Sequence, residues 1–116
     1  MPDSSALLAA LPDPVLALDR DRVVRFINPA TEQFFSVSAA ALIGRPLGEF
    51  LSLHSPLFAL ADAVWKSGGS ISEYDVLVDG PRFPPRTVTI AGAPAGEGAE
   101  LIVLTLHERS MADKID

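Results

Sequence analysis

A six-residue apolar run near the end of the chain, residues 101–106 (Leu-Ile-Val-Leu-Thr-Leu), constrains the fold more than any other feature. The run is far shorter than the ~20 apolar residues that a membrane-spanning helix needs, and its length is typical of a β-strand. A strand that does not alternate between apolar and polar residues has to be covered on both faces. We therefore expect a central strand, with the hydrophobic core on one face and a partner on the other.

Alternating apolar residues and turn residues predict further strands and a series of helices. Strands are expected over residues 15–18, 22–27, 70–79 and 87–90, with a proline-rich loop over 80–85 and a hairpin connection over 92–98. Short helices are expected over residues 29–35, 39–43 and 46–51. The longest helix begins at the Ser55-Pro56 cap, repeats apolar residues at helical spacing and ends at Gly68. Asn28 caps the helix at 29–35 in the same way.

Both ends of the chain carry helical patterns. Near the start, Leu7, Leu8 and Leu11 fall on one stripe of a two-turn helix, which has to dock on another surface because so short a helix is marginal in water. Near the end, Ser110 is followed three residues later by an acid, a pattern typical of a helix start. We expect three parts: a capping and dimerisation helix over residues 1–13, the main domain over 14–109, and over 110–116 the beginning of an exit helix that continues in a longer parent protein.

The order of the elements predicts an α+β fold. Two strands, a run of helices and then three strands favour a five-stranded antiparallel sheet with short helices on one face. The N-terminal helix, or a second copy of the chain, is expected to cover the other face. On the last strand, that outer face carries either Ile102 and Leu104 or the alternate set, Leu101 and Val103.

Composition argues against several classes of function. The 116 residues include no cysteine, which excludes disulfides and thiolate metal sites, and scattered positive charges with a net charge of −6 argue against nucleic-acid binding. His54 and His107 are too few and too far apart in sequence for a zinc site. The sequence has no signal-peptide pattern, nucleophile elbow or P-loop. We therefore expect a cytoplasmic domain without catalytic or metal-binding residues and without contact to a membrane.

Residues 24–32 (Val-Arg-Phe-Ile-Asn-Pro-Ala-Thr-Glu) resemble the strand-to-helix Asn-x-Ala segment of PAS domains. Gly44 resembles the glycine that closes the next helical turn of those domains, and residues 108–110 fall where many of them end in Asp-Ile-Thr. The resemblance spans roughly residues 14–110 and implies a PAS fold.

The PAS resemblance also implies a space between sheet and helices that can hold a metabolite. The residues expected to line it are Phe26, Phe34, Leu42, Phe50, Leu60, Val64 and Tyr74. They are apolar and bulky and include no convergent polar groups, so we expect the protein to fill this space itself, without haem or flavin. A small-metabolite-binding sensor with the same fold is the alternative.

Residues 11–15 (Leu-Pro-Asp-Pro-Val) and 106–116 resemble the sensor region of NtrB-type nitrogen-regulatory histidine kinases. This resemblance implies a homodimeric signalling module of a two-component system. In the parent, a kinase core would act on a response regulator, and a PII-type protein would deliver the nitrogen signal. Glu108, Arg109 and Ser110 would couple the last strand to the exit helix. His107-Glu108 is not expected to be the phosphoacceptor pair, because His107 follows a strand instead of lying on a long helix.

Overall fold

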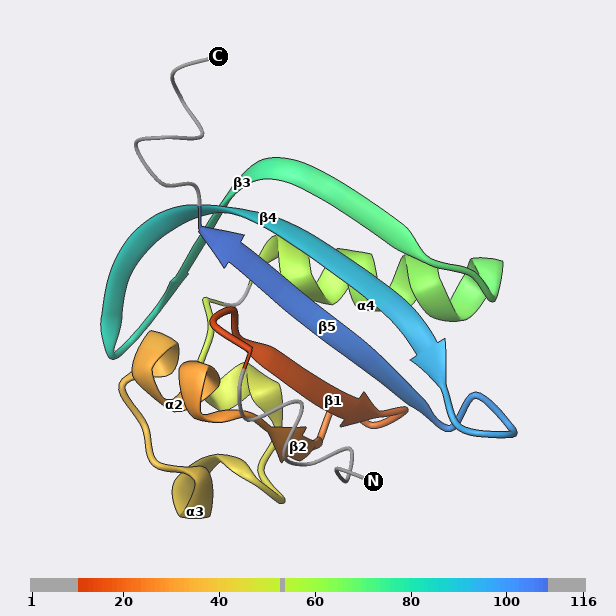
Figure 1. The fold of residues 1–116 in the computed structure, drawn as a ribbon, viewed down its shortest axis with the longest axis horizontal. Helices are drawn as coiled ribbons and strands as arrows, with labels where there is room; N and C mark the ends of the chain where they lie inside the picture. Colours follow the sequence, from red (N-terminus) through yellow and green to blue (C-terminus); the bar gives the residue numbers. More distant parts are fainter. Residues whose placement is uncertain (1–10, 53, 109–116) are drawn as a thin grey trace.

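The computed structural model describes residues 11–52 and 54–108. Five strands form one antiparallel sheet in the order β2-β1-β5-β4-β3, so the last strand of the chain lies at its centre (Figure 1). The strands are β1 (Val15–Asp19), β2 (Val24–Ile27), β3 (Ile71–Gly80), β4 (Phe83–Ala95) and β5 (Leu101–Glu108). The α+β class, the five-stranded antiparallel sheet and the central position of the last strand are confirmed. The predictions for Leu7, Leu8, Arg109 and Ser110 lie outside the described residues.

The helices of the described residues pack on one face of the sheet. They are α2 (Pro29–Phe35), α3 (Ala39–Leu42), the 3-10 turn η1 (Leu47–Glu49) and α4 (Pro56–Ser67). The local signals that predicted α2 and α4 are confirmed in detail. Asn28 and Ser55 each accept a hydrogen bond from the first turn of the helix that follows, and Gly68 ends α4 in the left-handed conformation with φ 72°.

The pairing register decides which side of β5 faces the helices. Ile102 and Leu104 pair with two leucines of β1, and all of these residues are fully or almost fully buried in one core cluster. Of the two alternatives for the outer face, the set Ile102 and Leu104 is therefore wrong. Because successive side chains of a strand point to opposite faces, the alternate set, Leu101 and Val103, lies on the outer face, where both residues are partly exposed.

The loop predicted over residues 80–85 is largely strand, because β4 begins at Phe83 and runs through three prolines to Ala95. Pro84 and Pro85 fall at an irregularity between the pairs Gly80–Phe83 and Val78–Arg86. Proline is tolerated in a sheet at such an irregularity, where its missing N–H does not interrupt a regular ladder. The β5 strand is also longer than predicted, so His107 lies within the strand and not after it.

α4 packs closely against β4 at Gly92. A Cβ atom added to Gly92 of β4 would come within 3.0 Å of both Leu104 and Val64. Farther along, the rings of Phe34, Phe35 and Phe83 form a cluster in edge-on and tilted contacts, with centroids 5.1–5.5 Å apart. The absence of a side chain at Gly92 thus permits close approach of the helix to the sheet.

Within the described ranges, the helices are all too short or too polar to cross a bilayer.

Candidate functional site

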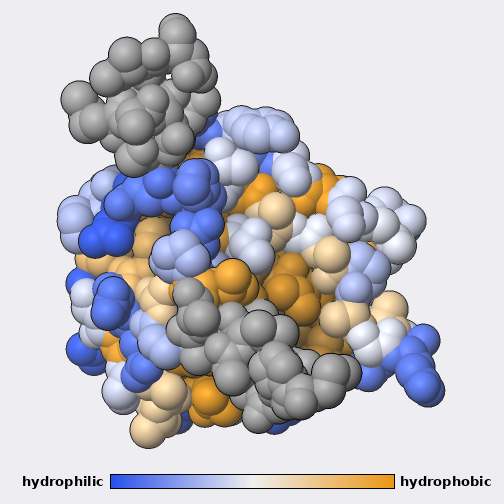
Figure 2. Space-filling view, in the orientation of Figure 1, coloured by the Kyte–Doolittle hydropathy of each residue, from blue (hydrophilic) through white to orange (hydrophobic). Residues whose placement is uncertain are grey.

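The outer face of the sheet, opposite the helices, carries small and apolar side chains. The register places Thr105 beside Ala91, and Val103 beside Ala93, on this face. A shallow depression of about 170 Å³ lies over these residues and the start of β3. In the view of Figure 1, α4 runs behind β4, and Figure 2 shows apolar surface on the near side. The inner face of the sheet is therefore closed by helices, while part of the outer face remains open in the described structure.

Three contacts converge at the end of β5 and tie it to other elements. The backbone N–H of Leu106 donates a hydrogen bond to the carbonyl of Pro14, 3.1 Å away. The next residue, His107, places Nδ1 3.0 Å from a carboxylate oxygen of Asp13. Finally, Glu108 Oε1 lies 3.6 Å from Nε of Arg86 on β4. The position of the last two residues of β5 therefore depends on both β4 and the segment that precedes β1.

Asn28 holds the start of β1 against α2. Its side chain is almost fully buried, and Oδ1 accepts hydrogen bonds from the backbone N–H groups of Val15 at 2.9 Å and Thr31 at 3.2 Å. Its Nδ2 donates to the carbonyl of Asp13 at 2.9 Å. The sequence identified Asn28 as a helix cap. It carried no signal for the contacts to Val15 and Asp13, which connect this residue to the segment beside the end of β5.

The residues predicted to line an internal pocket are divided between two faces and the surface. Five of them belong to the buried core cluster, namely Phe34, Leu42, Phe50, Leu60 and Val64. Phe26 pairs with Ala17, whose neighbours in β1 point into the core, so Phe26 lies on the outer face. Tyr74 is 75% exposed on the edge strand β3. The assignment of Phe26 and Tyr74 to the pocket is therefore wrong.

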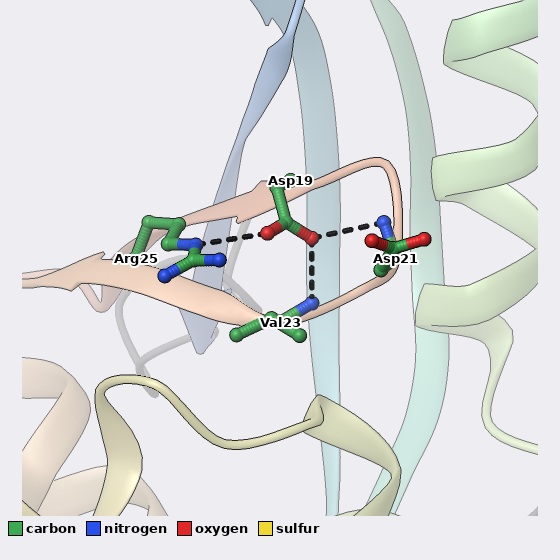
Figure 3. Close-up of polar contacts among 4 residues, drawn as sticks. All are labelled: Asp19, Asp21, Val23 and Arg25. Atoms are coloured by element: carbon green, nitrogen blue, oxygen red, sulfur yellow. Dashed lines mark hydrogen bonds and ion pairs between the residues drawn. The ribbon is translucent and has the colours of Figure 1, made fainter.

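The β1–β2 turn is organised around the carboxylate of Asp19 (Figure 3). Its Oδ1 accepts from the backbone N–H groups of Asp21 and Val23 at 2.9 and 3.0 Å, and its Oδ2 accepts from Arg25 Nε at 2.8 Å. Burial opposes the charged form, but these hydrogen bonds and the positive charge of Arg25 outweigh it and hold the pKa of Asp19 below its ordinary value. The turn is thus held by an ionised carboxylate.

Two arginines from the same turn contact α4. Arg22 donates two hydrogen bonds to the carboxylate of Asp62 on α4, at 2.8 and 2.9 Å, and lies over the ring of Phe58. Arg20 lies over the ring of Trp65, also on α4. The β1–β2 turn therefore contacts α4 at two points, and a sliding movement of α4 would break these contacts.

Comparison with known proteins gives a consistent result. The family model described as "PAS fold" matches residues 8–112. The chain is 40% identical over 114 residues to the sensory histidine kinase/phosphatase NtrB of Azospirillum brasilense, which covers 98% of this chain and 28% of that protein. Identity to the protein of the same name from Rhizobium meliloti is 35% over 114 residues, covering 97% of this chain and 30% of the relative. The chain thus spans less than a third of the length of these relatives.

A solved structure agrees with these sequence matches. The crystal structure of the PAS domain of nitrogen regulation protein NR(II) from Vibrio parahaemolyticus superposes with a TM-score of 0.74 at 26% identity, covering 95% of this chain and all of that domain. The similarity therefore extends over the sheet and the helices together.

Proposed function

Because the chain belongs to the family of PAS-fold domains, we propose that it is the signalling and homodimerisation module of a nitrogen-regulatory sensor histidine kinase. The observation that carries the proposal is the similarity to the NtrB kinase/phosphatases along almost the whole chain. Autophosphorylation and phosphotransfer to a response regulator would then belong to the remainder of a cytoplasmic parent protein. A PII-type regulatory protein would be a further partner of that parent.

In this proposal, the end of β5 relays the signal. The contacts of His107 with Asp13 and of Glu108 with Arg86 make the exit direction of the chain depend on the elements on either side of β5. Both contacts are between exposed side chains, so each contributes at most about 1 kcal/mol. A signalling domain that switches between two packings needs them to differ in free energy by only a few kcal/mol. Making or breaking such contacts can therefore shift the balance between the two packings.

The outer face of the sheet is the surface that we assign to self-association. Burial of Leu101 and Val103 against a second copy would remove apolar area from water and cover the second side of the central strand. Leu11, at the edge of the described chain, is 45% exposed and is the one member of the predicted leucine stripe that the structure describes.

A domain exchange tests the proposed function. The 114 aligned residues of the Azospirillum brasilense kinase/phosphatase are replaced by this chain, and autophosphorylation and phosphatase rates are measured with and without a PII-type protein. We expect the chimera to retain both activities and their response. We also expect Glu108→Ala in the chimera to change the ratio of kinase to phosphatase activity, since it removes the contact to Arg86.

The matched control is a chimera that carries the PAS domain of Bordetella pertussis BvgS, which shares the fold with this chain at only 19% identity. Equal regulation by both chimeras would show that any PAS fold suffices and would contradict the specific assignment. An unchanged activity ratio in the Glu108→Ala chimera would contradict the relay through β5.

A further inference from the structure

A hollow of about 300 Å³ opens beside the end of β5, at the margin of the core cluster. Its walls come from residues 12–14, from α2 and from the ends of β4 and β5, and no residue of α3 or α4 contributes. Phe34 and Leu106 are almost fully buried, so they give the hollow an apolar floor. It thus opens between α2 and the ends of β4 and β5, at the residues proposed to relay the signal.

The rim of the hollow carries groups of both charges. Arg86 provides a guanidinium group, Asp13 and Glu108 provide carboxylates, and Gln33 provides a carboxamide. The guanidinium of Arg86 lies over the ring of Phe34, with Cζ 5.0 Å from the ring centroid, so one of its faces is held against the floor. Polar groups that converge above an apolar floor are typical of a small-molecule site.

The ion pair at this rim is loose. Nε of Arg86 lies 3.6 Å from Glu108, which is beyond hydrogen-bond distance. Among the described residues, the arginine–carboxylate pairs of Arg22, Arg25 and Arg45 are each 2.8 Å long. Because a guanidinium has five N–H donors and Glu108 occupies none of them at hydrogen-bond distance, Arg86 retains donors for a carboxylate from outside the chain.

We propose that this hollow binds a free α-amino acid in its zwitterionic form. The ligand carboxylate accepts hydrogen bonds from Arg86, its ammonium group donates to Glu108 and Asp13, and its side chain lies on Phe34 and Leu106. The two carboxylates, of Asp13 and Glu108, would repel a ligand with two negative charges. The guanidinium of Arg86 would repel an amine that carries no carboxylate. Asp13 also contacts His107, so the ligand would join both contacts that hold the end of β5.

The inference deepens the proposed function, since the ligand would act through the same residues, but binding can be measured without any signalling assay. The 116-residue chain is titrated in a calorimeter with L-leucine, L-alanine and L-glutamine in turn. We expect saturable binding of at least one of them, with L-leucine favoured by the apolar floor. Arg86→Gln should weaken binding at least tenfold, which corresponds to about 1.4 kcal/mol. Isoamylamine and 4-methylpentanoate, which each keep one charge of leucine, should also bind at least tenfold more weakly.

Arg82→Gln is the matched control, because Arg82 is exposed on the same hairpin and does not line the hollow. Circular dichroism verifies folding of each variant, and Glu108→Gln replaces Arg86→Gln if the latter unfolds. The inference is overturned if none of the three amino acids binds, if the tested rim variant and Arg82→Gln bind alike, or if either single-charge analogue binds as tightly as L-leucine. Binding that persists when the domain exchange fails would contradict the proposed function alone. Regulation that persists without binding would contradict this inference alone.

Discussion

Replacement of Asn28 by alanine should be among the most destabilising single changes in the described part of the chain outside the apolar core. The substitution removes the acceptor for the buried N–H groups of Val15 and Thr31 and the donor to Asp13. Loss of a helix cap costs about 1 kcal/mol, and a buried donor left without an acceptor costs about 1–3 kcal/mol. We therefore expect the free energy of unfolding to fall by about 2–4 kcal/mol. In a domain of this size, each kcal/mol lowers Tm by about 4 °C.

Urea denaturation followed by circular dichroism measures this loss, with an unchanged m-value as evidence that the same surface unfolds. Ser38→Ala is the matched control, because Ser38 precedes α3 but its side chain makes no capping hydrogen bond. It should change the free energy of unfolding by less than about 0.5 kcal/mol. Asn28→Asp keeps the acceptor and loses the donor, so its loss of free energy of unfolding should lie between those of Ser38→Ala and Asn28→Ala. The reasoning is refuted if Asn28→Ala costs less than about 1 kcal/mol or no more than Ser38→Ala.

Three further changes test other parts of the structure. Asp19→Asn should lower the free energy of unfolding by about 1–2 kcal/mol at neutral pH. The lowered pKa of Asp19 stabilises the fold at pH values above the pKa of the unfolded chain, and this stabilisation is lost as the pH falls, so on acidification below about pH 4 the variant should lose less stability than the unmodified chain. Equal acid sensitivity of the two proteins in urea titrations would contradict the role of the Asp19 carboxylate. Gly92→Ala should cost about 1–3 kcal/mol by overpacking against Val64, and a neutral or positive change in Tm would show that α4 can move away. Val103→Glu on the outer face should weaken self-association in sedimentation equilibrium without loss of helix content, and an unchanged oligomer would remove this face as the dimer surface.

The elements that were predictable from the sequence are those with a local signal. The Asn28-Pro29 start of α2 and the Ser55 start of α4 depend on hydrogen bonds within one helical turn, so a few neighbouring residues suffice to specify them. The position of β5 was also predictable, because a strand that is apolar on both sides cannot lie at an edge exposed to water. The long neighbouring strand β4 was less predictable from the sequence. Pro84 and Pro85 are typical of a loop, and only the irregular pairing of β4 with β3 accommodates them in a strand.

Which face of β5 turns toward the helices could not be read from the run of apolar residues, since both alternating sets are hydrophobic. The pairing of Ile102 and Leu104 with the core side of β1 decides it, and that pairing depends on the register of the whole sheet. The same is true at the end of β5, where Asp13 and His107 are 94 residues apart in sequence. Local patterns specify which residues form a helix or a strand, because their energies arise between near neighbours. Contacts across the sheet arise only when distant strands align, so the tertiary structure alone brings Arg86, Glu108 and Asp13 around one hollow.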